Sequence, residues 1–224
     1  MHRPIALLVA LSLSFAVSAA DSLGRVVAPR VAKPPVIDGK VNPVEWKSAT
    51  HVALSEGGGE ALLLHDGNYL YVGIIGYLPG IGSVCVRGRS GIRVLHASAA
   101  LGTAAFEPEE GKWRLTRPFT WTNRDTGKSA EAMADREKFL ATSGWFANTS
   151  PAVQVMREFQ IPARGQAEVP IVIGFYTYTK AKQLVNYWPP SIEDDCVDIE
   201  LAGGFTDRDY TFDPSKWGVV VLKQ

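Results

Sequence analysis

Short runs of β-branched and aromatic residues, separated by glycine and proline, recur along almost the whole chain. Such runs are typical of strands, whereas the glycines and prolines between them turn or break the chain. One window, residues 129–140, instead has a helical pattern, with Ser129 as a candidate N-cap and Ala132, Arg136 and Phe139 at helical spacing. Many short strands and one short helix predict an all-β fold, an antiparallel β-sandwich.

Turn residues locate several of the expected strands. Asp38-Gly39 is a turn signal at the end of a short strand, and Asn42 is placed to cap one helical turn at 43–46. The expected strands are 36–40, 61–64 and 69–75 (a hairpin about the turn 66–68), 84–86, 92–96, 113–115, 118–121, 153–161, 169–179, 197–201 and 218–222.

The first twenty residues have the three parts of a secretory signal peptide. Arg3 supplies the positive charge, residues 5–17 form an apolar run, and Ser18-Ala19-Ala20 offers small residues for cleavage. The run is short for a membrane-spanning helix, although an uncleaved anchor is the alternative. We therefore expect a signal peptide at 1–20, a single domain at 21–224, and a secreted, periplasmic or cell-surface location.

Charge and cysteine content narrow the class of protein further. The chain has 23 basic and 23 acidic residues, and only one of the basic residues lies in the signal. A nearly neutral domain lacks the electrostatic footprint of a nucleic-acid-binding protein. Cys85 and Cys196 would meet oxidising conditions in an exported chain, so we expect a disulfide, with two buried thiols as the alternative.

Four segments carry a family resemblance. They are Pro-Val-Ile-Asp-Gly-Lys at 35–40 followed by Glu45, Trp46 and Ala49, then Asp-Gly-Asn-Tyr-Leu-Tyr-Val-Gly at 66–73, Glu-Phe-Gln-Ile-Pro at 158–162, and Tyr-Trp-Pro at 187–189. Their order is similar to that in the family 9 carbohydrate-binding modules and their DOMON-like relatives. The resemblance implies a sandwich of two antiparallel sheets that binds sugars, often at the cell surface.

The chain departs from this family in one stretch. Relatives often have acidic residues after the Leu-Tyr-Val strand, where this chain has the apolar, glycine-rich residues 76–82. The motifs themselves also have structural explanations, because Asp38-Gly39 is a turn and Trp46 is expected to pack into the core. The resemblance therefore bears more on the fold than on the ligand.

Aromatic side chains are the candidate sugar-binding residues, because the C–H faces of pyranose rings stack on flat rings. The candidates are Trp113, Trp121, Trp145, Tyr187 and Trp188. Trp188 is the first choice, since Pro189-Pro190 should place it on an ordered loop, and Trp145 and Tyr187 come next. The alternative for each tryptophan is a place in the core.

Other chemistry has weaker support in the sequence. Glu193, Asp194 and Asp195 could bind calcium, but they lack the spacing of an EF-hand loop, and a solvated acidic loop is the simpler interpretation. The histidines lack zinc spacing, and nothing pairs Asp38, Glu45 or Asp66 as glycosidase carboxylates. We therefore expect no catalytic site and no cofactor, with calcium as the exception to consider.

Three functional hypotheses follow. The first is a secreted, non-catalytic module that binds a poly- or oligosaccharide through aromatic side chains. The second is a structural or partner-binding cell-envelope protein without a sugar site. The third is a haem-binding DOMON-like domain, which would need an axial ligand such as Met133, Met156 or His65.

Overall fold

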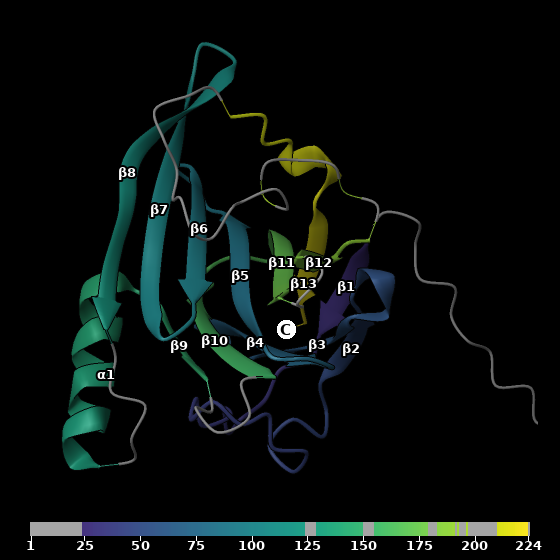
Figure 1. The fold of residues 1–224 in the computed structure, drawn as a ribbon, viewed down its shortest axis with the longest axis vertical. Helices are drawn as coiled ribbons and strands as arrows, with labels where there is room; N and C mark the ends of the chain where they lie inside the picture. Colours follow the sequence, from purple (N-terminus) through teal and green to yellow (C-terminus); the bar gives the residue numbers. More distant parts are fainter. Residues whose placement is uncertain are drawn as a thin grey trace, which may run out of the picture.

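The fold is a β-sandwich of two sheets, seen in a computed structural model (Figure 1). The structure describes residues 24–123, 129–149, 155–178, 183–190, 192, 196 and 210–223. These residues form thirteen strands, one α-helix and two short 3-10 helices, η1 (Ser55–Gly57) and η2 (Pro214–Lys216). The expected signal peptide at 1–20 lies outside the described residues. The all-β prediction is confirmed.

The larger, eight-stranded sheet has the order β1-β13-β11-β5-β6-β7-β8, and β12 also pairs with β11. All of its pairs are antiparallel except β1 with β13, which run parallel. The strands are β1 (Arg25–Ala28), β5 (Gly80–Arg87), β6 (Ile92–Ala97), β7 (Ala100–Glu109), β8 (Lys112–Asn123), β11 (Glu168–Tyr178), β12 (Gln183–Trp188) and β13 (Gly218–Leu222).

The smaller, five-stranded sheet has the order β2-β3-β4-β10-β9 and is antiparallel throughout. Its strands are β2 (Thr50–Ala53), β3 (Gly59–His65), β4 (Tyr69–Gly76), β9 (Phe146–Thr149) and β10 (Met156–Pro162). The expected hairpin is β3 and β4, and its turn is fixed because Asp66 Oδ1 accepts hydrogen bonds from the backbone N–H groups of Asn68 (2.7 Å) and Tyr69 (2.8 Å).

Helix α1 (Ala130–Ser143) lies beside β9 at one side of the sandwich (Figure 1). Its start was predicted correctly, since the Ser129 hydroxyl accepts a hydrogen bond from the N–H of Ala132 at 3.1 Å. The helix runs three residues beyond the expected end and stops at Gly144, which has a φ of 74°. Within the described residues, no helix has the length and apolar character needed to cross a membrane.

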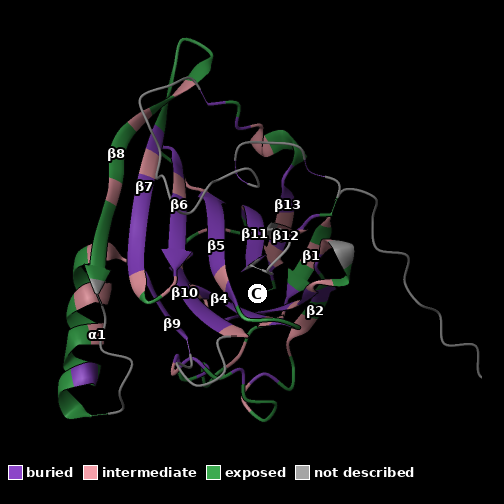
Figure 2. Cartoon of the chain, in the orientation of Figure 1, coloured by how far each residue is buried: buried purple, intermediate pink, exposed green. Residues whose placement is uncertain are grey.

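Two apolar clusters stabilise the sandwich, and most strand residues are buried (Figure 2). The first fills the space between the sheets, and the expected core residue Trp46 belongs to it. The second covers the other, outer face of the eight-stranded sheet, where Tyr210, Phe212 and Trp217 pack on Phe106 and its neighbours. The eight-stranded sheet is therefore covered on both faces over part of its area.

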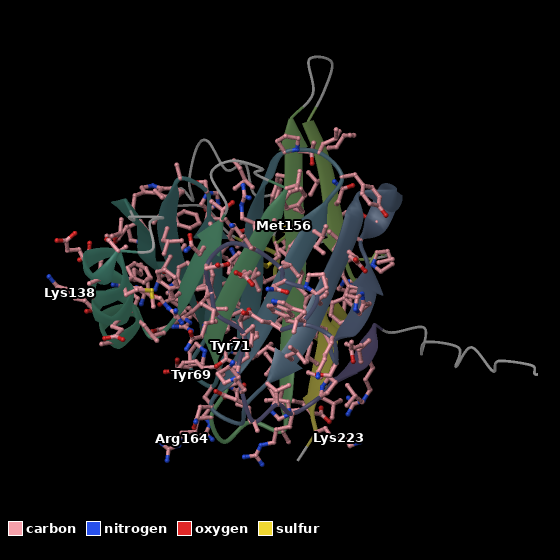
Figure 3. The ribbon with its side chains drawn as sticks, turned by 90° about the horizontal axis from the view of Figure 1, so that it is seen from below. Tyr69, Tyr71, Lys138, Met156, Arg164 and Lys223 are labelled. Atoms are coloured by element: carbon pink, nitrogen blue, oxygen red, sulfur yellow. A yellow bond between two sulfur atoms is a disulfide. The ribbon has the colours of Figure 1, made fainter. Side chains whose placement is uncertain are left out.

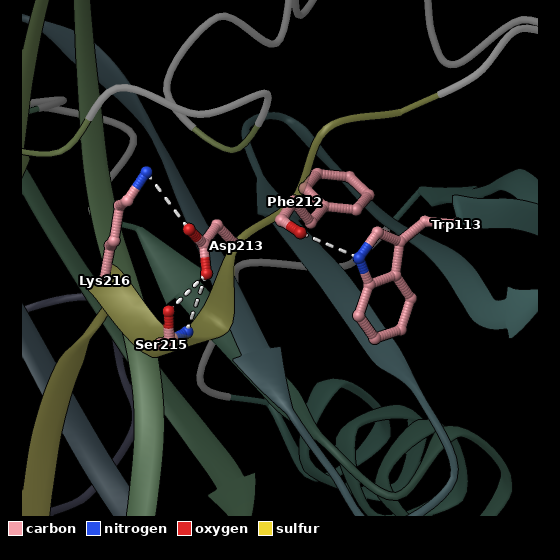
Figure 4. Close-up of polar contacts among 5 residues, drawn as sticks. All are labelled: Trp113, Phe212, Asp213, Ser215 and Lys216. Atoms are coloured by element: carbon pink, nitrogen blue, oxygen red, sulfur yellow. Dashed lines mark hydrogen bonds and ion pairs between the residues drawn. The ribbon is translucent and has the colours of Figure 1, made fainter. Parts of the chain in front are cut away.

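The segment that covers the outer face is tied down covalently and by hydrogen bonds. Cys85 on β5 forms a disulfide with Cys196, which confirms the prediction, and the two Cα atoms are 6.1 Å apart. Trp113 Nε1 donates a hydrogen bond to the Phe212 carbonyl at 2.8 Å, beside the Asp213 side chain that caps η2 (Figure 4). Cys196 and residues 210–217 are thus held against the sheet.

Two of the segments behind the family resemblance meet at one carboxyl group. Glu158 on β10 is fully buried, and it accepts hydrogen bonds from Trp46 Nε1 (3.0 Å) and from the backbone N–H groups of Gly39 (2.7 Å) and Lys40 (3.1 Å). Gly39 has a φ of 86°, as expected for the turn. These motif residues therefore hold the 38–46 loop against the five-stranded sheet.

Several sequence-based boundaries were wrong. Residues 36–40 form a turn held by Glu158 and no strand, because their N–H groups bond a side chain instead of a neighbouring strand. The two short strands expected at 113–115 and 118–121 are one long strand, β8, which pairs with β7 across two register shifts. Strand β10 begins at Met156, and the expected strand at 197–201 lies outside the described residues.

Candidate functional site

The two tryptophans chosen first from the sequence are core residues. Trp188 is the last residue of β12 and only 4% exposed, and its ring packs so closely on Gly218 that a Cβ there would come within 2.3 Å of it. Trp145 is 0% exposed and donates a hydrogen bond from Nε1 to Thr103 Oγ1 at 2.8 Å. The expectation that Trp188 stands on an exposed loop is wrong, because its strand is paired with β11.

Trp121 is the exposed tryptophan of this chain. All six tryptophans lie within the described residues, and Trp121, near the end of β8, is 45% exposed while Trp113 is half-buried and the other four are buried. Its ring stacks on Phe119 with 5.0 Å between ring centroids. Its ring also lies over Gly102, where an added Cβ would come within 2.8 Å of the indole. The indole is therefore exposed and at the same time fixed by its neighbours.

Trp121 lies at one end of a row of paired residues that crosses the outer face of the eight-stranded sheet. The row joins six strands and, read from β12 to β8, consists of Tyr187, Gly174, Ser83, His96, Gly102 and Trp121. Paired residues in antiparallel strands point to the same face, so the row has a half-buried tyrosine at one end, an exposed tryptophan at the other, and small residues with one histidine between them. The third predicted residue, Tyr187, thus shares this face with Trp121.

His96 is the polar residue next to Trp121. The two rings meet edge-to-face with 4.9 Å between centroids, and His96 is 2% exposed. Burial, and to a smaller degree the charge of Arg157, lowers the pKa of His96 to about 4, so its ring is neutral at neutral pH. Its Nδ1 atom has no hydrogen-bond partner among the described residues. A neutral imidazole with unused hydrogen-bonding capacity therefore adjoins the exposed indole.

A second group of exposed apolar side chains lies at the same end of the sheet. Tyr77 and Leu78, in the loop between β4 and β5, are 74% and 48% exposed. Strand β5 begins after this loop, and β8 ends just beyond Trp121, so the antiparallel topology brings the loop and Trp121 to one end of the sheet. The apolar stretch 76–82, which distinguishes this chain from the family it resembles, contributes these side chains.

The carboxylates considered for glycosidase chemistry serve local turns. Asp38 accepts a hydrogen bond from the N–H of Lys40 at 3.0 Å, Glu45 accepts one from the N–H of Val36 at 3.1 Å, and Asp66 fixes the β3–β4 turn. Burial raises the pKa of Glu158 to about 8, but both of its oxygens are occupied and the residue is inaccessible. The structure therefore does not bring these groups together as a catalytic pair.

The candidate metal and haem ligands are not assembled either. Glu193, Asp194 and Asp195 lie outside the described residues, and among the residues described no group of three or more His, Cys, Asp or Glu could hold a metal ion. His65 and Met156 lie at opposite ends of the five-stranded sheet, because His65 pairs with Leu70 and Met156 with Ile75. Met133 lies on α1 and is exposed. No two of these three share a site.

Comparison of the chain with family models, with curated proteins and with solved structures gave no match. The resemblance to the family 9 carbohydrate-binding modules thus stays a prediction from motifs.

Proposed function

We propose that this protein is a non-catalytic carbohydrate-binding protein, exported to the periplasm or cell surface, whose sugar platform is Trp121. The observation that carries the proposal is the exposure of an indole that its neighbours hold in place. A sugar that stacks on a pre-positioned ring loses less free energy to ordering than one that must immobilise a mobile side chain. Phe119, Gly102 and His96 hold the indole in place before any ligand arrives.

The residues between Trp121 and Tyr187 in the row are buried, so the proposed sugar contact is confined to the exposed indole of Trp121. The neutral His96 is 2% exposed, so it packs against the indole and supports it without reaching a ligand. Tyr187 lies five strands away on the same face. Neighbouring strands are about 4.8 Å apart, so Tyr187 lies roughly 24 Å from Trp121 and is not part of the same sugar contact.

The test is a glycan array followed by calorimetry on the parent protein and three variants. Trp121→Ala should abolish binding, Trp121→Phe should retain part of it, and Thr122→Ala should bind like the parent, because Thr122 is exposed on the opposite face of β8. Since Trp121 is nearly half exposed, Trp121→Ala should cost about 1–2 kcal/mol of stability, well below the cost of truncating a core tryptophan. A parent protein that binds no glycan, or a Trp121→Ala variant that binds normally, would refute the proposal.

A second candidate function is partner binding in the cell envelope, and the exposure of Tyr77 and Leu78 favours it. These side chains and Trp121 place apolar area at one end of the sheet, and such area often marks a protein interface. Replacing Tyr77 and Leu78 by serine should then remove a cross-linked partner from cells while leaving glycan binding unchanged.

A further inference from the structure

A cavity of about 380 Å³ opens at another place, between the β5–β6 turn and the loop after β10. Its apolar lining includes Val86 and Pro162, and its charged lining consists of Arg93, Arg164 and Glu107. Arg93 pairs with Ala105 on the inner face of the eight-stranded sheet, the face opposite to Trp121. Arg164 is exposed and lies at the edge of the molecule (Figure 3). The cavity is therefore separate from the surface around Trp121.

Glu107 also lines this cavity, but no ion pair among the described residues joins it to Arg93 or Arg164. Arg93 donates a long hydrogen bond to the Ser143 carbonyl (3.5 Å) at the end of α1, and none of the ion pairs among the described residues includes Arg93, Arg164 or Arg117. Arg117 lies one strand beyond Ala105 on the same face. Burial and repulsion from Arg117 lower the pKa of Arg93, so an anion beside it would relieve an existing electrostatic cost.

The two loops that form the cavity are tied together. Arg89 donates a hydrogen bond to the Gly165 carbonyl at 3.4 Å, which joins the β5–β6 turn to the loop after β10. The turn is closed by a hydrogen bond from Gly88 N to Gly91 O at 2.8 Å. Gly91 approaches the Phe106 carbonyl so closely that an added Cβ would come within 2.1 Å of it. The cavity is therefore formed without a ligand, as is usual for small-molecule sites.

We propose that this cavity binds a small organic acid of about the size of a sugar acid, with its carboxylate held between Arg93 and Arg164. A guanidinium group donates two parallel N–H bonds to a carboxylate, and the apolar part of the lining adds contacts that inorganic phosphate cannot make. Val86 and Pro162 provide the apolar wall that a carbon skeleton needs. The volume lies at the lower end of the range of small-molecule pockets, which suits a ligand of about ten heavy atoms.

The experiment is calorimetric titration of the purified protein with D-glucuronate, using D-glucose and inorganic phosphate as comparison ligands. Glucuronate should bind saturably, and phosphate should bind more weakly than glucuronate. Any heat of binding from glucose should be the same in the parent and in the variants of Arg93 and Arg164. Arg164→Gln and Arg93→Gln should each weaken glucuronate binding about tenfold or more, since each removes a charged hydrogen bond. Arg164 is exposed, so its variant folds even if the Arg93 variant is unstable.

Two control variants test whether glucuronate binding depends on this cavity and not on general surface charge or on the surface around Trp121. Arg114→Gln removes one positive charge from an exposed pair with Glu109 and should bind glucuronate like the parent. Trp121→Ala should also bind it like the parent, so the two sites can fail independently. Absent glucuronate binding, equal binding of glucuronate and phosphate, or unchanged affinity in Arg164→Gln would overturn the proposal.

Discussion

Replacing Glu158 by glutamine tests which of two opposing effects controls the buried carboxyl group. Its three N–H donors, from Trp46, Gly39 and Lys40, each favour the carboxylate, whereas burial disfavours the charge. Burial is the larger effect, and it raises the pKa from 4.5 to about 8. Glutamine keeps the size of the side chain and remains neutral at every pH, so the variant removes the titration and little else.

The raised pKa makes the contribution of Glu158 to the stability of the parent fall as pH increases. Below pH 4.5 the folded and unfolded states both hold the proton, whereas between pH 4.5 and about 8 the unfolded chain releases it first. The contribution of Glu158 to the free energy of unfolding therefore decreases by about 1.4 kcal/mol per pH unit, which amounts to about 5 kcal/mol by pH 8. The glutamine variant escapes this loss, but its amide N–H group faces another N–H donor, which costs about 1–3 kcal/mol at any pH.

The two stability curves should therefore cross. Urea unfolding at pH 5, 6, 7 and 8 should show Glu158→Gln less stable than the parent at pH 5 and more stable at pH 8. His96 titrates below this range and is present in both proteins, so its contribution cancels. Glu137→Gln, an exposed position on α1, is the matched control and should follow the parent at a constant offset. A Glu158→Gln deficit that stays constant or grows with pH would show that the carboxyl is ionised in the fold and that its donors outweigh burial.

Two further predictions concern the disulfide and the buried tryptophan. Replacing Cys85 and Cys196 together by serine should lower the free energy of unfolding by up to about 4–5 kcal/mol, because the disulfide closes a sequence separation of 111 residues. Urea unfolding of the oxidised parent and of the variant measures this difference. Equal stability of the two proteins would contradict the prediction. Trp188→Ala should lower the free energy of unfolding by about 3–5 kcal/mol and the melting temperature as much as Trp46→Ala does, since both rings are buried. A melting temperature close to that of Trp121→Ala would show that Trp188 contributes little to the core.

Local features of the fold could be predicted from the sequence because their causes are local. The turn at Asp66-Gly67 is fixed by one side chain bonding its own backbone, and the start of α1 by the hydroxyl of Ser129. By contrast, β7 has an alanine-rich sequence with little intrinsic strand preference, and it becomes a strand because β6 and β8 pair with it on both sides. The residues of β7 alone do not indicate that neighbouring strands will pair with it.

The candidate site was predicted less well, because the exposure of a side chain depends on residues that are far from it in the sequence. Pro189 and Pro190 suggested a loop at Trp188, yet the ring is buried since Gly218, thirty residues further on, leaves room for it. Trp121 was recognised as an aromatic candidate, but nothing near it in the sequence separates it from Trp113, whose indole bonds the Phe212 carbonyl. The choice among tryptophans needed the packing of the whole chain.

The parallel pairing of β1 with β13 has a consequence for the order in which the molecule can assemble. Strand β13 fills the slot between β1 and β11, so the first strand joins the sheet only through the last one. Until residues 218–222 arrive, β1 has no partner in this sheet and one edge of β11 presents unpaired N–H and C=O groups. Such edges recruit strands from other molecules. During synthesis, the chain therefore passes through an interval in which it is open to chaperones and to aggregation, and that interval ends only when β13 docks.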